Sequence, residues 1–294
     1  SPIHVVELSH LLLLSIDIQS QVFAPSEFAI IGTDNPDDFP VEKYLTLTDV
    51  DGLKLQLRLH YIKYPDSGGA FKVQIYSPYI FINQAGLPFA LKTKSWMGVA
   101  KLVAGQPQGA TASASKEPEP FLFSQNSNDR RNRMLLKIGE SAWSKPLSFE
   151  AIGSQTEVTI PSSTKNEEVH VGLTIEDGLG KFKLSKVVKL TPRYLITNHL
   201  GEPISLREAG AADFVTVEPG KRAPLHFLRV GAAKQLTLAY PGLNNKWTAP
   251  FNIEDIGVVH LRIAKASHHQ HLVKAEVLLE GPTIFISLHH ETGP

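Results

Sequence analysis

The sequence predicts an all-β protein built from tandem antiparallel β-sandwich repeats, because long segments recur at a fixed spacing and apolar and polar residues alternate along the chain. The clearest recurrence pairs YIFINQAGLP at residues 79–88 with YLITNHLGEP at residues 194–203, in which a tyrosine-led apolar run ends in NxxGxP. The two asparagines, Asn83 and Asn198, are 115 residues apart. A repeat of this length is typical of tandem folding units.

A second pair of segments keeps nearly the same spacing. WSKPLSFEAIG at residues 143–153 matches WTAPFNIEDIG at residues 247–257, with the tryptophan, a proline three positions on, a glutamate and the Ile-Gly pair in register. A fainter copy lies near the start, and PTIFIS at residues 282–287 repeats the apolar half of the first motif but has Ser287 in place of the asparagine. The repeats therefore extend over the whole chain.

The repeat spacing divides the 294 residues into three units. We expect the C-terminal part of one sandwich at residues 1–77, a second sandwich at residues 78–190 and a final sandwich at residues 191–294. A unit of about 110 residues is large enough to bury its own hydrophobic core. The chain begins with Ser1 and not with methionine, which suggests a piece of a longer protein.

Within each unit, the alternation of apolar and polar residues predicts half-buried strands, for example at residues 53–61 and 169–175. Turn signals separate these segments, and no window has a convincing helical period, so we expect little helix. Residues 103–120 are rich in Ala, Ser, Gly, Gln and Pro and predict a mobile loop without a role in folding. The basic run at residues 130–133 predicts a solvated strand edge.

The overall charge gives no sign of a nucleic-acid or anionic-lipid partner, because 29 Lys and Arg balance 29 Asp and Glu. The absence of cysteine excludes a disulfide framework, a thiol nucleophile and a cysteine-built zinc site. Residues 11–14 form the most apolar run, but the run is short and has charged neighbours. A buried strand is therefore favoured over a membrane span or a signal core.

The asparagine of the NxxGxP motif follows a predicted buried strand and precedes a glycine turn. Its amide can cap that turn by bonding backbone groups two residues on, while Gly86 and Gly201 adopt positive φ and Pro88 and Pro203 end the turn. We therefore favour a structural role for this asparagine. The alternative is that the same amide binds the backbone of an incoming peptide.

Trp143 and Trp247 stand at strand entrances with a proline three residues later, and we expect them to anchor the two hydrophobic cores. The alternative is a peptide groove lined by tryptophan and proline. Glu150 and Glu254 recur at equivalent positions of the two repeats. Their recurrence favours a structural role over membership of a single active site.

No GxSxG, Walker glycine loop, HExxH or GxGxxG occurs in the structural context that it requires. We therefore expect neither an enzyme nor a cofactor. Five histidines near the C-terminus could meet across a hairpin, but they occupy an expected loop and terminus, so we do not expect a metal site. These residues are His268, His269, His271, His289 and His290.

The repeated motifs resemble those of the adaptor-binding domain, also called the VAB or SHR-binding domain, of the vacuolar protein sorting thirteen family of bridge-like lipid transfer proteins. The resemblance rests on SPYIFINQAGLP at residues 77–88, ESAWSKPLSFEAIGS at residues 140–154 and KVVKLTPRYLITNHLGEP at residues 186–203. It implies a string of six sandwich repeats, each with a signature asparagine. This chain would hold the end of one repeat and two further repeats.

The resemblance also implies a non-enzymatic domain that binds short Pro-x-Pro motifs of membrane-associated organelle adaptors. Such binding would place a cytoplasmic lipid transfer protein at membrane contact sites, without nucleic acid and without direct membrane insertion. Two alternatives remain open: a structural spacer, and a carbohydrate-binding or carbohydrate-processing sandwich. A spacer would lack an exposed edge with apolar residues beside it, and a sugar site would need a carboxylate pair or an exposed aromatic platform.

We expect the peptide to add as a strand to an exposed sheet edge of the final unit, near residues 258–263, 272–279 or 284–288. Its prolines would lie where the peptide N–H faces solvent and would contact apolar side chains of the domain. The side chains predicted to make this contact are Leu261, Ile263, Val277 and Phe285.

Overall fold

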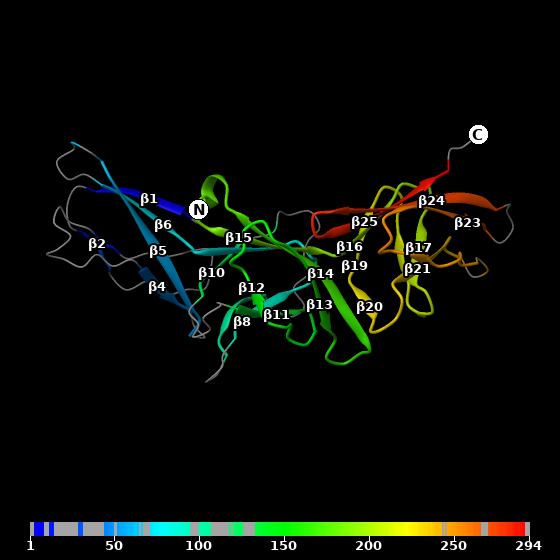
Figure 1. The fold of residues 1–294 in the computed structure, drawn as a ribbon, viewed down its shortest axis with the longest axis horizontal. Coiled ribbons are helices and arrows are strands. Elements are labelled where there is room, and N and C mark those ends of the chain that lie inside the picture. Colours follow the sequence, from blue (N-terminus) through cyan, green and yellow to red (C-terminus); the bar gives the residue numbers. More distant parts are fainter. Residues whose placement is uncertain are drawn as a thin grey trace.

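The computed structural model describes residues 3–8, 12–14, 29–31, 44–49, 52–64, 66, 71–94, 100–106, 118, 120–125, 133–242, 244, 246–265 and 270–291. Strands make up most of this part of the chain, and its one helical element is the short 3-10 helix η1 (Gly180–Phe182). The strands form mainly antiparallel sheets that follow one another along the long axis of the molecule (Figure 1). The predicted all-β fold of tandem sandwiches is confirmed.

The middle sandwich has two sheets that share one core. The larger sheet has the order β10-β7-β15-β14-β13, formed by Pro120–Phe123, Tyr79–Asn83, Lys186–Pro192, Glu167–Asp177 and Gln155–Pro161. The smaller sheet has the order β12-β11-β8-β9, formed by Leu147–Ser148, Arg133–Ile138, Phe89–Thr93 and Leu102–Gly105. Alternate apolar residues of both sheets fill the core, including Phe81, Phe89, Phe123, Leu136, Phe149 and Val171.

The final sandwich repeats this arrangement. Its larger sheet has the order β19-β16-β25-β24-β23, formed by Arg222–Leu225, Tyr194–Asn198, Thr283–His290, His271–Glu280 and Gly257–Ile263. Its smaller sheet has the order β18-β17-β21-β22, formed by Val215–Val217, Ile204–Glu208, Gln235–Ala239 and Phe251–Asn252. The core between them includes Tyr194, Ile196, Leu206, Leu238, Phe251, Val273 and Ile286.

The first and last strands of each complete sandwich pair in parallel. Tyr79 at the start of β7 lies opposite Lys186 of β15, and Tyr194 at the start of β16 lies opposite Ile284 of β25. Both copies of the tyrosine-led motif therefore open a sandwich at the same place in its larger sheet. Because β15 runs to Pro192, we propose the boundary between the two sandwiches at Arg193, the residue that separates β15 from β16.

The first unit contributes a four-stranded sheet with the order β1-β6-β5-β4, formed by Ile3–Leu8, Phe71–Tyr76, Lys54–Lys63 and Tyr44–Thr48. A separate pair joins β2 (Leu12–Leu14) to β3 (Ala29–Ile31). Leucines of β4 and β5 and apolar residues of β6 form a third core, against which Leu122 of the middle sandwich packs. The Gln56 N–H also donates to Ser124 Oγ at 2.9 Å, so the first unit and the middle sandwich contact each other directly.

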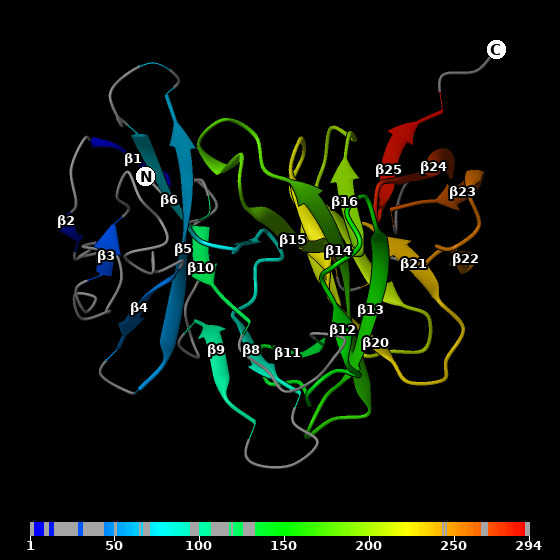
Figure 2. The same cartoon turned by 60° about the vertical axis from the view of Figure 1, so that its left-hand side comes forward.

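A strand of the final sandwich extends the larger sheet of the middle sandwich. Strand β20 (Phe227–Arg229) pairs antiparallel with the N-terminal part of β14, and the His170 N–H donates to the His226 carbonyl at 2.9 Å just beyond this ladder. The C-terminal part of β14 pairs with β15 of its own sandwich. Figure 2 shows β20 near β14, and the two strands pair, so the two sandwiches share backbone hydrogen bonds at their junction.

The expected loop at residues 103–120 is only partly correct. Val103 and Ala104 belong to β9, are each 6% exposed and lie in the core of the middle sandwich, so the expectation that this whole segment has no role in folding is wrong. Two small apolar residues give too little periodic signal to stand out beside a Gly- and Ser-rich stretch. Residues 107–117, and residues 130–132 of the basic run, lie outside the described residues.

We expect Gly172→Ala to destabilise the protein by about 1–3 kcal/mol, because the junction leaves no room for a side chain there. A Cβ at residue 172 would lie 2.7 Å from Pro282 Cβ and 2.9 Å from the Pro282 carbonyl oxygen. Gly201→Ala is the matched control, since no heavy atom lies within 4 Å of that Cβ and Gly201 does not adopt positive φ. Urea unfolding should show a loss for Gly172→Ala only, and equal stability of the two variants would contradict the prediction.

Candidate functional site

The asparagine of each NxxGxP motif holds the turn that follows the first strand of its sandwich. Asn198 Oδ1 accepts the Leu200 N–H at 2.8 Å, and its Nδ2 donates to the carbonyls of Glu202 and Val217, both at 2.9 Å. Asn198 is fully buried, so its amide is not available to an incoming peptide. The geometry of Asn198 therefore shows the structural role that the turn chemistry predicts.

Asn83 makes the equivalent bonds in the middle sandwich. Its Oδ1 accepts the Ala85 N–H at 3.0 Å, and its Nδ2 donates to the Leu87 carbonyl at 2.7 Å and to Gln106 Oε1 at 2.8 Å. The third partner is a side chain here and a backbone carbonyl in the final sandwich. Asn83 is also partly exposed, so its side-chain hydrogen bonds are more accessible to solvent than those of Asn198.

The glycines of the two motifs differ. Gly86 adopts φ +87° as predicted, whereas Gly201 does not adopt positive φ, so that part of the prediction is wrong for the final sandwich. A turn closed by three side-chain hydrogen bonds does not require a left-handed glycine at the same position. Pro88 and Pro203 lie immediately before β8 and β17, where they end the two turns.

The recurring glutamates bond to the tyrosines that open each sandwich. The Tyr79 hydroxyl donates to Glu150 Oε1 at 2.8 Å, and the Tyr194 hydroxyl lies 3.4 Å from Glu254 Oε1. Burial, and then the neighbouring glutamate, raises the pKa of both tyrosines above the usual range. Each pair ties the end of the tryptophan segment to the start of the first strand, which is a structural role.

The tryptophans do not anchor the cores, so this expectation is wrong. Trp143 and Trp247 are only partly buried and lie outside the core clusters of their sandwiches. The next residue takes the inward position: Ser144 Oγ accepts the Leu136 N–H at 2.9 Å, and Thr248 Oγ1 accepts the Leu238 N–H at 3.0 Å. The shared pattern W-[ST]-x-P was the signal for this bond, but the size of tryptophan made it the more obvious core candidate.

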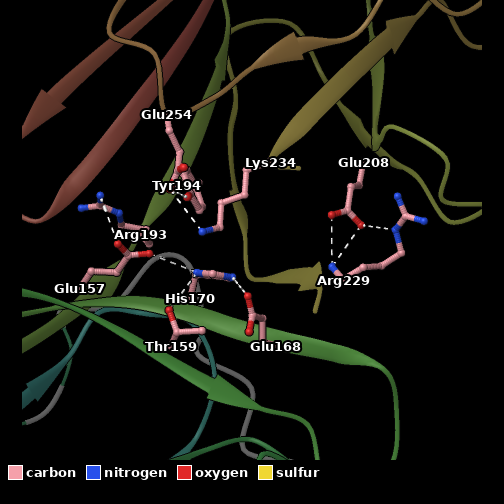
Figure 3. A network of polar contacts seen from close by, with 10 residues as sticks. All are labelled: Glu157, Thr159, Glu168, His170, Arg193, Tyr194, Glu208, Arg229, Lys234 and Glu254. Atoms are coloured by element: carbon pink, nitrogen blue, oxygen red, sulfur yellow. Dashed lines mark hydrogen bonds and ion pairs between the residues drawn. The ribbon is translucent and has the colours of Figure 1, made fainter. Parts of the chain in front are cut away.

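Charged side chains from both sandwiches meet at the junction (Figure 3). His170 is fully buried, with Nδ1 3.3 Å from Glu157 Oε1 and Nε2 3.1 Å from Glu168 Oε1, although the Nε2 contact is not a hydrogen bond. Arg193, from the segment between the sandwiches, lies 3.5 Å from Glu157. The hydrogen bond from His170, together with the charges of Arg193, His170 and Lys234, lowers the pKa of Glu157.

An ion pair between Glu208 and Arg229 lies on the other side of this junction. Glu208 of β17 is 6% exposed, and its Oε1 accepts a hydrogen bond from Arg229 Nε at 2.8 Å (Figure 3). Both carboxylate oxygens of Glu208 also accept from the Arg229 backbone N–H. Glu208 therefore ties β20 to β17 of its own sandwich while β20 also pairs with β14, a link that strand periodicity does not reveal.

Three of the four predicted peptide-contact residues lie in the core, which corrects that prediction. Leu261, Ile263 and Val277 are 4%, 2% and 0% exposed, and only Phe285 is partly exposed. Successive side chains of a strand point to opposite faces, and the sequence does not say which face is covered. The outward-facing or exposed apolar residues next to these positions are Ile256, Val258, Leu278 and Leu279, at 55%, 48%, 47% and 54% exposure.

The exposed apolar residues lie beside an edge strand. Strand β23 is the last strand of its sheet and pairs with β24 on one side, and no partner strand lies on its other side in the described part of the chain. Val258 lies opposite Glu276, and Leu278 lies opposite Phe285 of β25. The outer face of the final sheet thus has an apolar surface that reaches the edge at β23.

The C-terminal histidines do not form a metal site within the described residues, where no group of three or more His, Cys, Asp or Glu could hold a metal ion. His271 Nε2 lies 2.6 Å from the Tyr240 hydroxyl, and His289 stacks on His199 with ring centroids 4.5 Å apart. His268 and His269 lie outside the described residues. Among the helices of that same part of the chain, none is long and apolar enough to cross a membrane.

Comparison with known proteins gives the same family as the repeated motifs. The family described as "Vacuolar-sorting associated protein 13, adaptor binding domain" matches residues 1–294. The chain belongs to this family. The adaptor-binding domain is 47% identical over 291 residues to the intermembrane lipid transfer protein VPS13 of Chaetomium thermophilum, which covers 99% of this chain and 9% of that protein.

More distant relatives carry similar names. The intermembrane lipid transfer protein vps13E of Dictyostelium discoideum is 28% identical over 145 residues, covering 46% of this chain and 3% of that protein. The human intermembrane lipid transfer protein VPS13D is 21% identical over 262 residues, covering 83% of this chain and 6% of that protein. The adaptor-binding domain thus spans less than a tenth of the length of these relatives.

We expect Asn198→Ala to cost about 1–3 kcal/mol of stability, because it removes the partner of the buried Leu200 N–H, of the buried Val217 carbonyl and of the partly buried Glu202 carbonyl. Asn83→Ala should cost less, since Asn83 is partly exposed and water can replace one of its partners. Thermal and urea unfolding of both variants measure the difference. An unchanged melting temperature for Asn198→Ala, together with lost peptide binding, would favour direct peptide contact instead.

A histidine at the junction should make stability depend on pH. Burial lowers the pKa of His226 to about 4, so between pH 6.5 and 4 the folded protein binds fewer protons at this residue than the unfolded chain. Acidification through that window therefore favours unfolding, by about 2 kcal/mol at pH 5. Urea unfolding at pH 7.5 and pH 5 should show a smaller loss for His226→Gln than for the unaltered protein. Equal losses would contradict the prediction.

Proposed function

We propose that the adaptor-binding domain captures a Pro-x-Pro segment of an adaptor protein by adding it as a strand to the free edge of β23. The proposal rests on the edge position of β23 beside exposed apolar residues. Unpaired backbone N–H and C=O groups of an edge strand supply the hydrogen bonds, and neighbouring side chains supply the selection. The family membership supports the choice of an adaptor as the partner.

Strand β23 fits this role better than the equivalent edge of the middle sandwich. Strand β13 also ends its sheet, but its outward residues are Gln155, Glu157 and Thr159, and it ends at Pro161. Glu157 is also engaged with His170 and Arg193. Charge and proline are devices that keep an edge strand unpaired. Strand β23 contains no proline, and its outward residues are Val258, His260 and Arg262, so it has an apolar residue at its start where β13 has Gln155.

Proline in the partner sets where the segment can lie. A proline lacks an N–H, so it fits a strand only at positions whose N–H would point away from the ladder. Two prolines separated by one residue satisfy this condition together, because alternate residues have the same orientation. Their rings then lie near Val258 of β23, with Leu278 of the neighbouring strand β24 beyond it. Phe285 lies on β25, two strands from β23, so a segment at this edge does not reach it.

The two alternatives are less well supported. A spacer would lack an apolar edge of the kind found at β23. A sugar-processing site would need a pair of carboxylates, but the recurring Glu150 and Glu254 lie in different sandwiches, and each bonds to a tyrosine. As part of a longer protein, the domain would serve to recruit a lipid transfer protein to organelle membranes and contact sites through its adaptor, without catalysis of its own.

We expect Val258→Lys to weaken binding of a Pro-x-Pro peptide roughly tenfold, because the variant removes an apolar contact beside the edge. Gln155→Lys is the matched control, since Gln155 is an exposed, outward-facing residue of the equivalent edge strand β13. Fluorescence polarisation with a labelled peptide measures affinity, and the same peptide with alanine in place of both prolines should not bind. Unchanged affinity for Val258→Lys, or an equal loss for Gln155→Lys, would show that β23 is not the site.

Substitution is a cleaner test than truncation or a core proline. Removal of residues 204–294 deletes β20 and leaves part of β14 unpaired, so the middle sandwich would lose a neighbour of its own sheet. A proline at Val277 would enter an interior strand of the core. His260→Pro is the better backbone variant, because His260 is exposed and lies on the edge strand itself. It should weaken binding if its N–H faces the free edge.

A further inference from the structure

The smaller sheet of the middle sandwich has an outward face with unusual charge. Its four strands, β12, β11, β8 and β9, contain Lys92, Arg133 and Lys137 and no Asp or Glu. The larger sheet of the same sandwich, in contrast, has five acidic residues on β13 and β14 and two lysines, Lys186 and Lys189, on β15. The balanced charge of the chain therefore hides an excess of positive charge on the smaller sheet.

Lys92 and Lys137 have no countercharge among the residues that the structure describes. In the described part of the chain, neither lysine forms an ion pair or a side-chain hydrogen bond, and the ammonium of Lys92 contacts only the Trp143 ring, at 4.2 Å. An aromatic face attracts an ammonium without neutralising its charge. Lys101 and Lys145, both exposed, also lie next to this surface without an ion-pair partner among the described residues. The face is thus positively charged, and among the described residues Lys92, Lys137, Lys101 and Lys145 have no ion-pair partner.

Apolar side chains lie among these cations. Leu102 of β9 is 54% exposed and lies opposite Lys92, and the partly exposed Leu135 of β11 lies opposite Lys92 on its other side. Trp143 completes the surface, and its indole N–H has no hydrogen-bond partner among the described residues. The bonds between Ser144 and Leu136 fix the tryptophan segment to β11, so the ring is held in place.

The final sandwich has the same three-part arrangement at the equivalent positions. Arg207 lies over the Trp247 ring at 4.1 Å, and Phe214, at 59% exposure, lies 6.1 Å from that ring. The next strand contributes Thr237, which lies opposite Arg207, is 7% exposed and has no hydrogen-bond partner for its hydroxyl among the described residues. Two sandwiches with different core sequences thus keep a cation, a tryptophan and an exposed apolar residue together outside the core.

We propose that the outer face of sheet β12-β11-β8-β9 binds an extended acidic segment of a partner protein, with Lys92, Lys137 and Trp143 as the contact residues. Lys137 lies opposite Ala90 and Lys92 lies opposite Leu135, so the two lysines are diagonal neighbours. Diagonal neighbours on a sheet are about 7–8 Å apart, which is close to the roughly 7 Å between alternate side chains of an extended peptide. Acidic residues at alternate positions can therefore reach both lysines.

The charge and the apolar residues of this face both favour an acidic peptide segment as the partner. A carboxylate is the countercharge that the two lysines lack, and an apolar side chain beside it can pack on Trp143 and Leu102. A membrane surface fits less well, because Trp143 and Leu135 are only partly exposed and Leu102 is the one strongly exposed apolar side chain of these four strands. The surface is on a different sheet and a different sandwich from β23, so it does not depend on the proposed Pro-x-Pro site.

The test uses the whole chain and a labelled model peptide with Glu at alternate positions around one Phe. Lys92→Gln/Lys137→Gln should raise the Kd of this peptide about tenfold or more, because both charge contacts are lost. Lys165→Gln/Lys183→Gln is the charge-matched control: both lysines are exposed on the same sandwich, away from the face, and have no ion-pair partner among the described residues. A peptide with Gln in place of Glu should not bind, and higher salt should weaken binding of the acidic peptide.

Two further measurements separate the alternatives. The Lys92→Gln/Lys137→Gln variant should bind a Pro-x-Pro peptide with unchanged affinity, and Val258→Lys should bind the acidic peptide with unchanged affinity. Vesicles of phosphatidylcholine and phosphatidylserine should not bind through this face. Binding of the vesicles but not of the peptide, no binding of the acidic peptide, or equal weakening by the control variant would each overturn the proposal.

Discussion

The parallel pairing of the first strand of each sandwich with its last strand is the constraint on which the rest of the molecule depends. Strand β7 pairs with β15 and β16 pairs with β25, although each pair is separated by the rest of its sandwich. The chain must therefore leave the larger sheet after the first strand and return to it at the end. Asn83 and Asn198 stand at the point of departure, where their side chains close the turn toward the smaller sheet.

This arrangement also determines how the sandwiches are joined. The last strand of one unit ends beside the position where the next unit begins, so only Arg193 separates β15 from β16. The following unit then returns β20 to pair with β14. Neighbouring units share the β14–β20 ladder and the backbone hydrogen bond from His170 to His226, while Glu208 ties Arg229 of β20 to its own sandwich (Figure 3).

The sequence predicted the fold more reliably than it predicted the site. Tandem repeats and period-two alternation depend on the sequence order alone, and they led to the all-β fold and to the turn chemistry of Asn198. Leu261, Ile263 and Val277 are strand residues as predicted, but their side chains face the core and not the solvent. A period of two defines two faces without saying which one is covered, because covering depends on strands that are distant in sequence.

The tryptophans and the lysines show a second limit of sequence reasoning. Large aromatic residues are usually buried, and this general rule favoured the wrong picture for Trp143 and Trp247. A balanced total charge does not say how the charges are distributed over the surface. The register places Lys92 between Leu102 and Leu135, and the hydroxyl of Ser144 takes the inward position that Trp143 would otherwise hold. Composition averages over the chain, whereas binding depends on which residues share a face. A domain with zero net charge can therefore have one sheet face suited to an acidic partner and one apolar edge suited to a proline-rich one.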